Sequence, residues 1–221
     1  MQNRQIIEPK RSIDVIHETD VLVVGSGPGG LSAAIASARC GVKTTLLERF
    51  GCFGGNITVV GVEGFAWYRH EKTVEAGGIG REFEELAKEM GAAVPESQSL
   101  SYELDSEGFK LVADKLVMDS GIHPMLHRSF SMPIMEGNTI IGVIVESKAG
   151  REAILSKVVI DATGDADVAF RAGAQLNTMP VEELMATSVM FHLAGVDKKA
   201  FLSEIQNLSL IHISEPTRRS T

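Results

Sequence analysis

The sequence predicts an α/β fold in which a parallel sheet carries helices and continues into antiparallel strands. Residues 20–48 contain an apolar strand, a glycine-rich turn, an Ala-rich helix and a second strand, which is the βαβ signature of a parallel sheet. Two amphipathic helices follow, at 79–90 and 106–120. From Met125 onward apolar residues recur with a period of two, which is typical of antiparallel strands.

The first βαβ unit begins after Asp20. The β-branched run from Val21 predicts a strand. Leu31–Cys40 is rich in alanine and is followed by Gly41, so it predicts a helix that ends at this glycine. Val42–Glu48 then predicts the neighbouring strand.

Two helices are expected in the middle of the chain. Ile79–Met90 places its apolar residues on one face, and Ser106–Ser120 repeats this pattern with Ser106 in the N-cap position. The residues between them, 92–105, are expected to form a loop.

The last predicted elements are strands. Thr139–Glu146 and Glu152–Ile160 flank a turn at Lys148–Gly150, which predicts an antiparallel hairpin. Met190–Val196 predicts one further strand.

Composition excludes several classes of protein. With 44% hydrophobic and 23% charged residues, the chain can bury a substantial core and is not globally disordered. It has 21 Lys and Arg against 29 Asp and Glu, a net charge of −8 without a basic cluster. This balance argues against nucleic acid or an anionic membrane as the main partner.

Cysteine content and the N-terminal sequence indicate a reducing compartment. The two cysteines, Cys40 and Cys52, are too few for a disulfide framework or a four-thiolate metal site. His123 and His127 are four residues apart, but they lie in a strand-like segment, where this spacing does not form a helical metal-binding pair. The first residues are charged where a signal peptide needs an apolar core, and no segment is apolar enough to span a membrane. We therefore expect a cytoplasmic protein that has no metal site.

The strongest motif is a GxGxxG sequence between the first strand and the first helix. The first glycine allows a tight turn, the second lets the main chain approach a pyrophosphate, and the third lets helix and strand pack closely. Leu31 stands where a P-loop needs lysine, and the serine lacks the spacing of a hydrolase elbow. The motif comprises Gly25, Ser26, Gly27, Pro28, Gly29 and Gly30.

A second motif, Glu48–Asn56, favours a flavin nucleotide. Glu48 ends the second predicted strand, where a carboxylate can accept both ribose hydroxyls of an adenosine. The double glycine Gly54–Gly55 follows Arg49 and precedes Asn56, and it offers bare main chain beside which a flavin's pyrophosphate and ribityl chain can run.

With the third motif, Val158–Asp165, the sequence resembles the glutathione-reductase-like FAD superfamily. More narrowly it is similar to the FAD-dependent oxidoreductase family, over about residues 20–196. In that family a strand followed by Ala-Thr-Gly-Asp turns beside the nucleotide, after a three-stranded β-meander to which 139–160 corresponds. This chain lacks the two cysteines that follow the double glycine in disulfide reductases, so dithiol–flavin exchange is excluded there.

The resemblance implies a Rossmann-like FAD-binding domain with a parallel sheet and an antiparallel β-meander. It implies segments as follows: an N-terminal arm (1–18), an FAD-binding domain (19–174) with a largely helical insertion (66–121) and the meander hairpin (139–160), and the beginning of a truncated substrate domain (175–207). Leu208–Arg218 resembles the translation of a sequencing adapter, so we expect 208–221 to be a non-native tail and the chain as given to be an inactive fragment.

The implied activity is hydride transfer between a small-molecule substrate and non-covalently bound FAD. The resemblance places the diphosphate on Gly25–Gly30, the ribose on Glu48, the adenine near Arg49, and the ribityl–flavin end at Gly54, Gly55 and Asn56. The nucleotide is also approached by Thr163, Gly164 and Asp165. Catalytic residues and the substrate are not identified.

Three alternatives stay open from the sequence. One is a fumarate-reductase-like flavoprotein, although the chain has no histidine motif for covalent flavin. Another is an electron-transfer subunit that needs a redox partner. The third is an NAD-dependent dehydrogenase that uses only the first βαβ unit, and the second and third motifs argue against it.

Overall fold

The computed structural model describes residues 5–65, 69–70, 74–75, 77–96 and 101–204. The chain divides into two compact units, Met1–Ala186 and Thr187–Thr221, which are described separately. The expected non-native tail, 208–221, lies outside the described residues.

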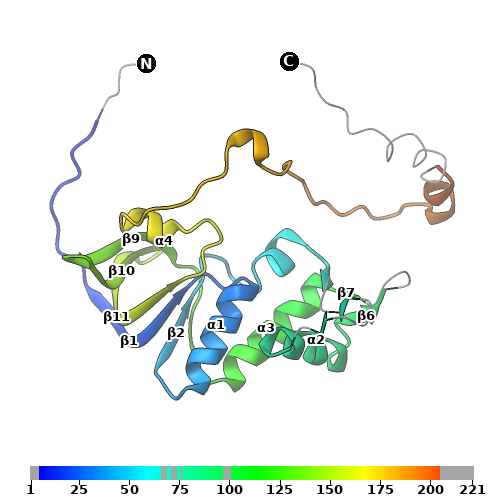
Figure 1. Ribbon diagram of the computed structural model, residues 1–221, viewed down its shortest axis with the longest axis horizontal. Helices are drawn as coiled ribbons and strands as arrows, with labels where there is room; N and C mark the ends of the chain where they lie inside the picture. Colours follow the sequence, from blue (N-terminus) through cyan, green and yellow to red (C-terminus); the bar gives the residue numbers. More distant parts are fainter. Residues whose placement is uncertain (1–4, 66–68, 71–73, 76, 97–100, 205–221) are drawn as a thin grey trace. The chain divides into compact units, whose positions relative to one another are not determined.

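The centre of the first unit is a six-stranded sheet (Figure 1). Its first four strands are parallel to one another, and the last two pairs of neighbours, β11 with β10 and β10 with β9, are antiparallel. In spatial order the strands are β8 (His123–Met125), β2 (Thr44–Leu47), β1 (Val15–Val24), β11 (Gly150–Asp161), β10 (Thr139–Ser147) and β9 (Ser129–Glu136).

The central strand β1 alternates its apolar side chains between the two faces of the sheet. Val23 belongs to the hydrophobic core on one face, whereas Leu22 and Val24 belong to the core on the other face. β1 begins earlier than the predicted start at Val21, because Val15 and the residues after it pair with β11 from Ala153 onward. That partner strand is far away in the sequence, so the local pattern did not indicate this extension.

Helices α1 (Pro28–Arg39) and α3 (Ser106–Asp119) cover one face of the sheet (Figure 1). Helix α1 has a proline in its first turn, which suits a helix start, and it ends at Arg39 just before Gly41. It buries one side against the sheet, through Gly30, Leu31, Ala34 and Ile35.

On the other face, side chains of β10 and β11 and of α4 (Asp167–Arg171) form one core with side chains of β1, β2 and β8; β9, β10 and β11 form the antiparallel meander of the same sheet. Thr139–Ser147 and Gly150–Asp161 pair as the antiparallel hairpin that the alternating pattern predicts. The buried side chains of this hairpin that belong to this core include Val143 and Val145 on β10 and Ile154 on β11.

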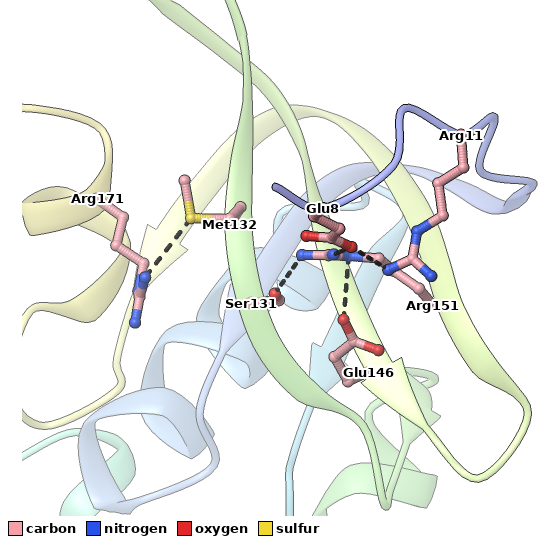
Figure 2. A network of polar contacts seen from close by, with 7 residues as sticks. All are labelled: Glu8, Arg11, Ser131, Met132, Glu146, Arg151 and Arg171. Atoms are coloured by element: carbon pink, nitrogen blue, oxygen red, sulfur yellow. Dashed lines mark hydrogen bonds and ion pairs between the residues drawn. The ribbon is translucent and has the colours of Figure 1, made fainter. Parts of the chain in front are cut away.

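Arg151 connects the three meander strands to the N-terminal arm (Figure 2). Its guanidinium contacts Glu8 Oε1 at 2.8 Å, donates to Ser131 Oγ at 3.0 Å and pairs with Glu146 Oε1 at 3.0 Å. These contacts are on the surface, so they fix the arm's position more than they stabilise the fold.

The segment between α1 and α3 contains more strands than the sequence predicts. Two three-residue strands, β6 (Ala93–Pro95) and β7 (Tyr102–Leu104), form within 92–105, where a loop is expected. They pair with each other, and β7 also pairs with β3 (Gly64–Phe65). Strands of three residues carry no recognisable alternation, because that pattern needs a run of about four residues or more.

The remaining elements of the first unit are α2 (Ile79–Glu89), the π-helical turn η1 (Asn56–Val60), the short hairpin β4 (Arg69–His70) and β5 (Val74–Glu75), and the 3-10 turn η2 (Val181–Glu183).

Helix α3 is capped one residue earlier than predicted. The N-cap is Asp105, whose carboxylate accepts a hydrogen bond from the Glu107 N–H at 3.0 Å. Ser106 instead donates its hydroxyl proton to Glu63 at 2.9 Å. Either residue type suits an N-cap, so the sequence does not distinguish the two positions.

The strand expected at Met190–Val196 is absent from the second unit as far as it is described. These residues lie in coil, and residues 198–204 are helical. Apolar side chains of the segment are exposed, with 73% of Phe191 and 70% of Leu193 accessible to solvent. A strand needs a hydrogen-bonded partner, and no strand lies beside this segment in the described residues.

Phe109 lies at the centre of the core between the sheet and the helices. It is fully buried, and its ring meets Phe65 and Phe83 edge to face, at 5.9 and 6.3 Å between centroids.

We expect Phe109→Ala to lower the free energy of unfolding by about 3–5 kcal/mol, because it leaves a cavity among groups that cannot collapse into it. Leu111→Ala, on the same helix but 62% exposed, is the matched control and should change stability by well under 1 kcal/mol. Urea unfolding measures both. Equal effects of the two substitutions would show that Phe109 is not central to the core.

His17 joins β1 to β8 across β2. Its ring stacks on His123 at 4.4 Å, and its Nε2 lies 2.9 Å from Thr45 Oγ1. Burial lowers the pKa of His17, and the positive charges of His123 and Lys43 lower the pKa further.

Because the folded pKa of His17 lies below the unfolded value of about 6.5, the neutral ring stabilises the fold above that pH. This contribution is lost as the pH falls through the folded pKa. We expect His17→Gln to flatten the decline in unfolding free energy below about pH 6.5, measured by urea unfolding at several pH values. His192→Gln is the control for the effect of removing an exposed histidine. Wild-type and His17→Gln curves that stay parallel would contradict the prediction.

Candidate functional site

A cavity of about 760 Å³ lies at the carboxyl ends of the parallel strands. The last residues of β1, β2 and β11, which are Val24, Leu47 and Asp161, all line it. This edge of a parallel α/β sheet, where strand ends meet a helix N-terminus, is the usual position of a ligand in such folds.

The glycine turn after β1 lies against the turn after β11. Gly25 has φ +99°, and a Cβ there would lie 2.3 Å from the carbonyl oxygen of Ala162. A Cβ at Gly30 would lie 1.9 Å from the carbonyl oxygen of Gly25. Gly27, in contrast, has open space where a Cβ would be. The outer glycines thus allow close packing, and the middle one leaves the main chain accessible from the cavity.

The double glycine packs on this turn. A Cβ at Gly55, where φ is +54°, would lie 2.6 Å from the Cα of Gly27, and the Gly54 N–H donates to the carbonyl oxygen of Ser26 at 2.9 Å. Gly55 and Asn56 line the cavity, whereas Gly54 is turned toward Thr58 and does not.

Helix α1 presents its N-terminus to the cavity. No side chain caps it and its first turn holds no acidic residue. The first amides of a helix have no intrahelical partner, and the helix dipole makes this end attractive to anions. Gly27, Pro28, Gly29 and Gly30 line the cavity at this end, so the site suits a phosphate or diphosphate.

Glu48 is a buried carboxylate at the end of β2, with 6% of its surface exposed. One oxygen accepts hydrogen bonds from the N–H and the hydroxyl of Ser26, and the other accepts from the Phe50 N–H at 3.0 Å. These donors fix the carboxylate on the cavity wall, where Oε1, which accepts one hydrogen bond, keeps a further lone pair for a ligand hydroxyl.

Asp161 organises the turn after β11. Its Oδ1 accepts from the N–H and hydroxyl of Thr163, at 3.1 and 2.7 Å, and its Oδ2 accepts from the Ala169 N–H at 2.9 Å. The Thr163 hydroxyl also accepts from the Asp167 N–H at 2.9 Å, so α4 is fixed to the turn. Ala166 has φ +58°, a strained value for a residue with a Cβ.

Several lining residues were not among the predicted site residues. Arg128, Ser129 and Phe130 come from the start of β9 and the residue before it, and Asp167, Ala169 and Arg171 come from α4. No spacing pattern in the sequence marks these residues, because the positions of β9 and α4 at the cavity depend on tertiary packing. Asp161 did carry a signal, since an acidic residue ends a strand just before the Ala-Thr-Gly turn.

In the described part of the chain we find neither a metal-binding cluster nor a membrane-spanning helix. It holds no group of three or more His, Cys, Asp or Glu side chains that could bind a metal ion. Within the same residues, no helix is both long and apolar enough to cross a bilayer. Cys40 and Cys52 are both free thiols.

A family model described as FAD dependent oxidoreductase matches residues 20–219. The chain belongs to this family. Its cofactor is FAD, as the sequence motifs predict. The matched range includes most of 208–221, so the expectation of a non-native tail stays a prediction.

Thiamine thiazole synthases are among the curated relatives of this chain. The protein of Metallosphaera sedula is 33% identical over 160 residues, which cover 67% of this chain and 55% of the relative. That of Saccharolobus islandicus is 29% identical over 206 residues, covering 88% and 69%. The chain therefore spans between about half and two thirds of the length of these relatives.

Solved structures confirm the Rossmann-like α/β fold predicted from the sequence. Thermovibrio ammonificans THI4 has a TM-score of 0.52 and 20% identity, over 70% of this chain and 61% of that one. A geranylgeranyl bacteriochlorophyll reductase-like protein of Thermoplasma acidophilum also has a TM-score of 0.52, with 21% identity over 72% of this chain and 43% of that one. At these identities the likeness concerns the fold alone.

The three predicted motifs of this family member meet at the cavity. Gly54 and Asp165 do not line it, and the other predicted residues do; these are Gly25, Ser26, Gly27, Pro28, Gly29, Gly30, Glu48, Arg49, Gly55, Asn56, Thr163 and Gly164. The Arg49 guanidinium lies over the Phe50 ring, 4.6 Å from its centroid. That these residues bind FAD stays a prediction.

We expect Gly55→Ala to weaken FAD binding by at least tenfold, because the new methyl group would push the double-glycine segment away from Gly27. Gly41→Ala is the matched control: Gly41 also has positive φ, +80°, but has open space around its Cβ position. Fluorescence titration with FAD and thermal unfolding measure both variants. Similar FAD affinity in the two variants would contradict the predicted role of this contact.

Proposed function

We propose that this chain binds FAD non-covalently and that the protein transfers hydride between a small-molecule substrate and the flavin. The observation that supports this most is the convergence of three bare main-chain segments on one cavity beside a helix N-terminus. Family membership supports the same cofactor.

The residues of the cavity fit the parts of the dinucleotide. The N–H groups of Gly27, Gly29 and Gly30 at the start of α1 would hold the diphosphate, and Glu48 Oε1 would accept a hydroxyl of the adenosine ribose. Thr163 and Gly164 would contact the nucleotide from the other side. Gly55 and Asn56 would border the flavin end, next to the apolar side chains of Val59 and Val60.

When bound, the flavin supplies the hydride-transfer chemistry. The chain's own contribution is to bind and orient: Glu48 is held rigidly by its three donors, and Asp161 holds the turn that carries Thr163. Val59, Val60 and Phe130 contribute apolar surface to the cavity wall, which excludes water from part of the site. None of these residues is assigned a proton-transfer role.

A second candidate is the activity named for the curated relatives, thiamine thiazole synthesis. The 33% identity to the Metallosphaera sedula protein favours it over other activities in the family. Nothing in the cavity distinguishes it, because the residues described here concern the nucleotide. Mass spectrometry for a thiazole product tests it directly.

The primary proposal predicts that the 221-residue chain takes up FAD with the absorption bands of a protein-bound flavin. We expect Glu48→Gln to weaken FAD binding about tenfold, because the variant loses the charge-assisted bonds to ribose and places an N–H group against the donors of Ser26 or Phe50.

Glu18→Gln is the control, since Glu18 is exposed on β1 and does not line the cavity. Equilibrium dialysis with FAD, and with NAD as the competitor cofactor, measures both variants. Tighter binding of NAD than of FAD by the wild-type chain would overturn the proposal.

A further inference from the structure

Arg171 is a cavity residue whose charge has no carboxylate partner among the described residues. It ends α4 and lines the cavity. The one contact found for its guanidinium is from Nη1 to the thioether sulfur of Met132 on β9, at 3.6 Å (Figure 2). A thioether is a weak acceptor, so most of the five N–H donors of Arg171 are left for solvent or a ligand.

The other arginines of the meander region are occupied by the protein. Arg128, which also lines the cavity, has its Nε 3.3 Å from Glu152 Oε2. Arg151 contacts Glu8 and Glu146 (Figure 2). Arg171 therefore differs from its neighbours in that its guanidinium is available to a molecule in the cavity.

The position of Arg171 indicates which part of a dinucleotide it would meet. Met132 follows Phe130 by two residues on β9, and Phe130 lines the cavity. The residue before β9, Arg128, donates its N–H to the carbonyl oxygen of Glu48 at 3.0 Å. Arg171 therefore contacts, four residues further along, the same strand whose beginning adjoins the residue assigned to the adenosine ribose.

We propose that Arg171 binds the adenine ring of the dinucleotide, through its planar guanidinium. This inference rests on the proposed FAD function, and it adds a specificity-determining residue for the adenosine half. A guanidinium is suited to the task because it stacks on aromatic faces and donates to ring nitrogens, while an ammonium group does neither as well.

The test measures the affinity of the 221-residue chain for ADP, which carries adenine without flavin, and for FMN, which carries flavin without adenine. Isothermal titration calorimetry gives both. We expect Arg171→Ala to weaken ADP binding about tenfold and to leave FMN binding within twofold, and we expect Arg171→Lys to recover only a small part of the loss.

Two controls separate this role from effects on folding. Arg11→Ala removes an exposed arginine that does not line the cavity, and Met132→Leu removes the thioether but keeps Arg171. Both should bind ADP as the wild type does, and thermal unfolding should show all variants folded.

Four results would overturn the inference. Unchanged ADP affinity in Arg171→Ala would show that Arg171 does not contact the nucleotide. Equal losses for ADP and FMN would assign it to a phosphate, as would full recovery in Arg171→Lys. A wild-type chain that binds neither ADP nor FAD would overturn the proposed function as well, whereas the first three results leave that function intact.

Discussion

The close approach of three main-chain segments is the constraint on which the rest of this structure depends. The turn after β1 contacts the turn after β11 where Gly25 meets Ala162, and it contacts the double-glycine segment where Gly55 meets Gly27. Side chains at these positions would force the segments apart. Because β1 lies between β2 and β11, its carboxyl end is the point at which all three can meet. The cavity exists because this junction is built from bare backbone.

Two acidic residues hold the junction from its two sides. Glu48 ends β2 and Asp161 ends β11, and each folds its carboxylate back to accept main-chain N–H groups of a loop at the cavity. Such charge-assisted bonds are stronger than neutral ones and fix the loops in the absence of regular structure. Positive charge at the cavity comes from the N-terminus of α1 and from Arg171, and it favours an anionic ligand there.

The sequence predicts an element correctly where that element depends on residues close to it in the chain. The first strand, glycine turn and helix lie within about twenty residues, and the Thr139–Asp161 hairpin follows from alternating apolar residues and a turn. The prediction fails where an element depends on a strand that is far away in the sequence. The early start of β1 depends on pairing with β11, and β6 and β7 depend on each other. The expected strand at Met190–Val196 has apolar residues but lacks a partner in the described chain.

The same distinction explains the site. The sequence predicts the glycines of the site because their role depends on the backbone at a single position. It predicts Glu48 because this residue ends its strand at the usual distance from Gly25. Arg128, Phe130 and Arg171 reach the cavity only after the meander folds back over the sheet.

The position of the cavity also separates cofactor binding from substrate choice. Every lining residue belongs to the unit Met1–Ala186. The proteins that share this fold carry names as different as thiazole synthase and bacteriochlorophyll reductase-like protein, although the Rossmann-like frame is common to them. A fold of this kind hosts many functions, because each function belongs to a site and not to the frame. If the proposed function holds, the glycine turns and strand ends at this cavity would determine the cofactor, and other surfaces would select the substrate.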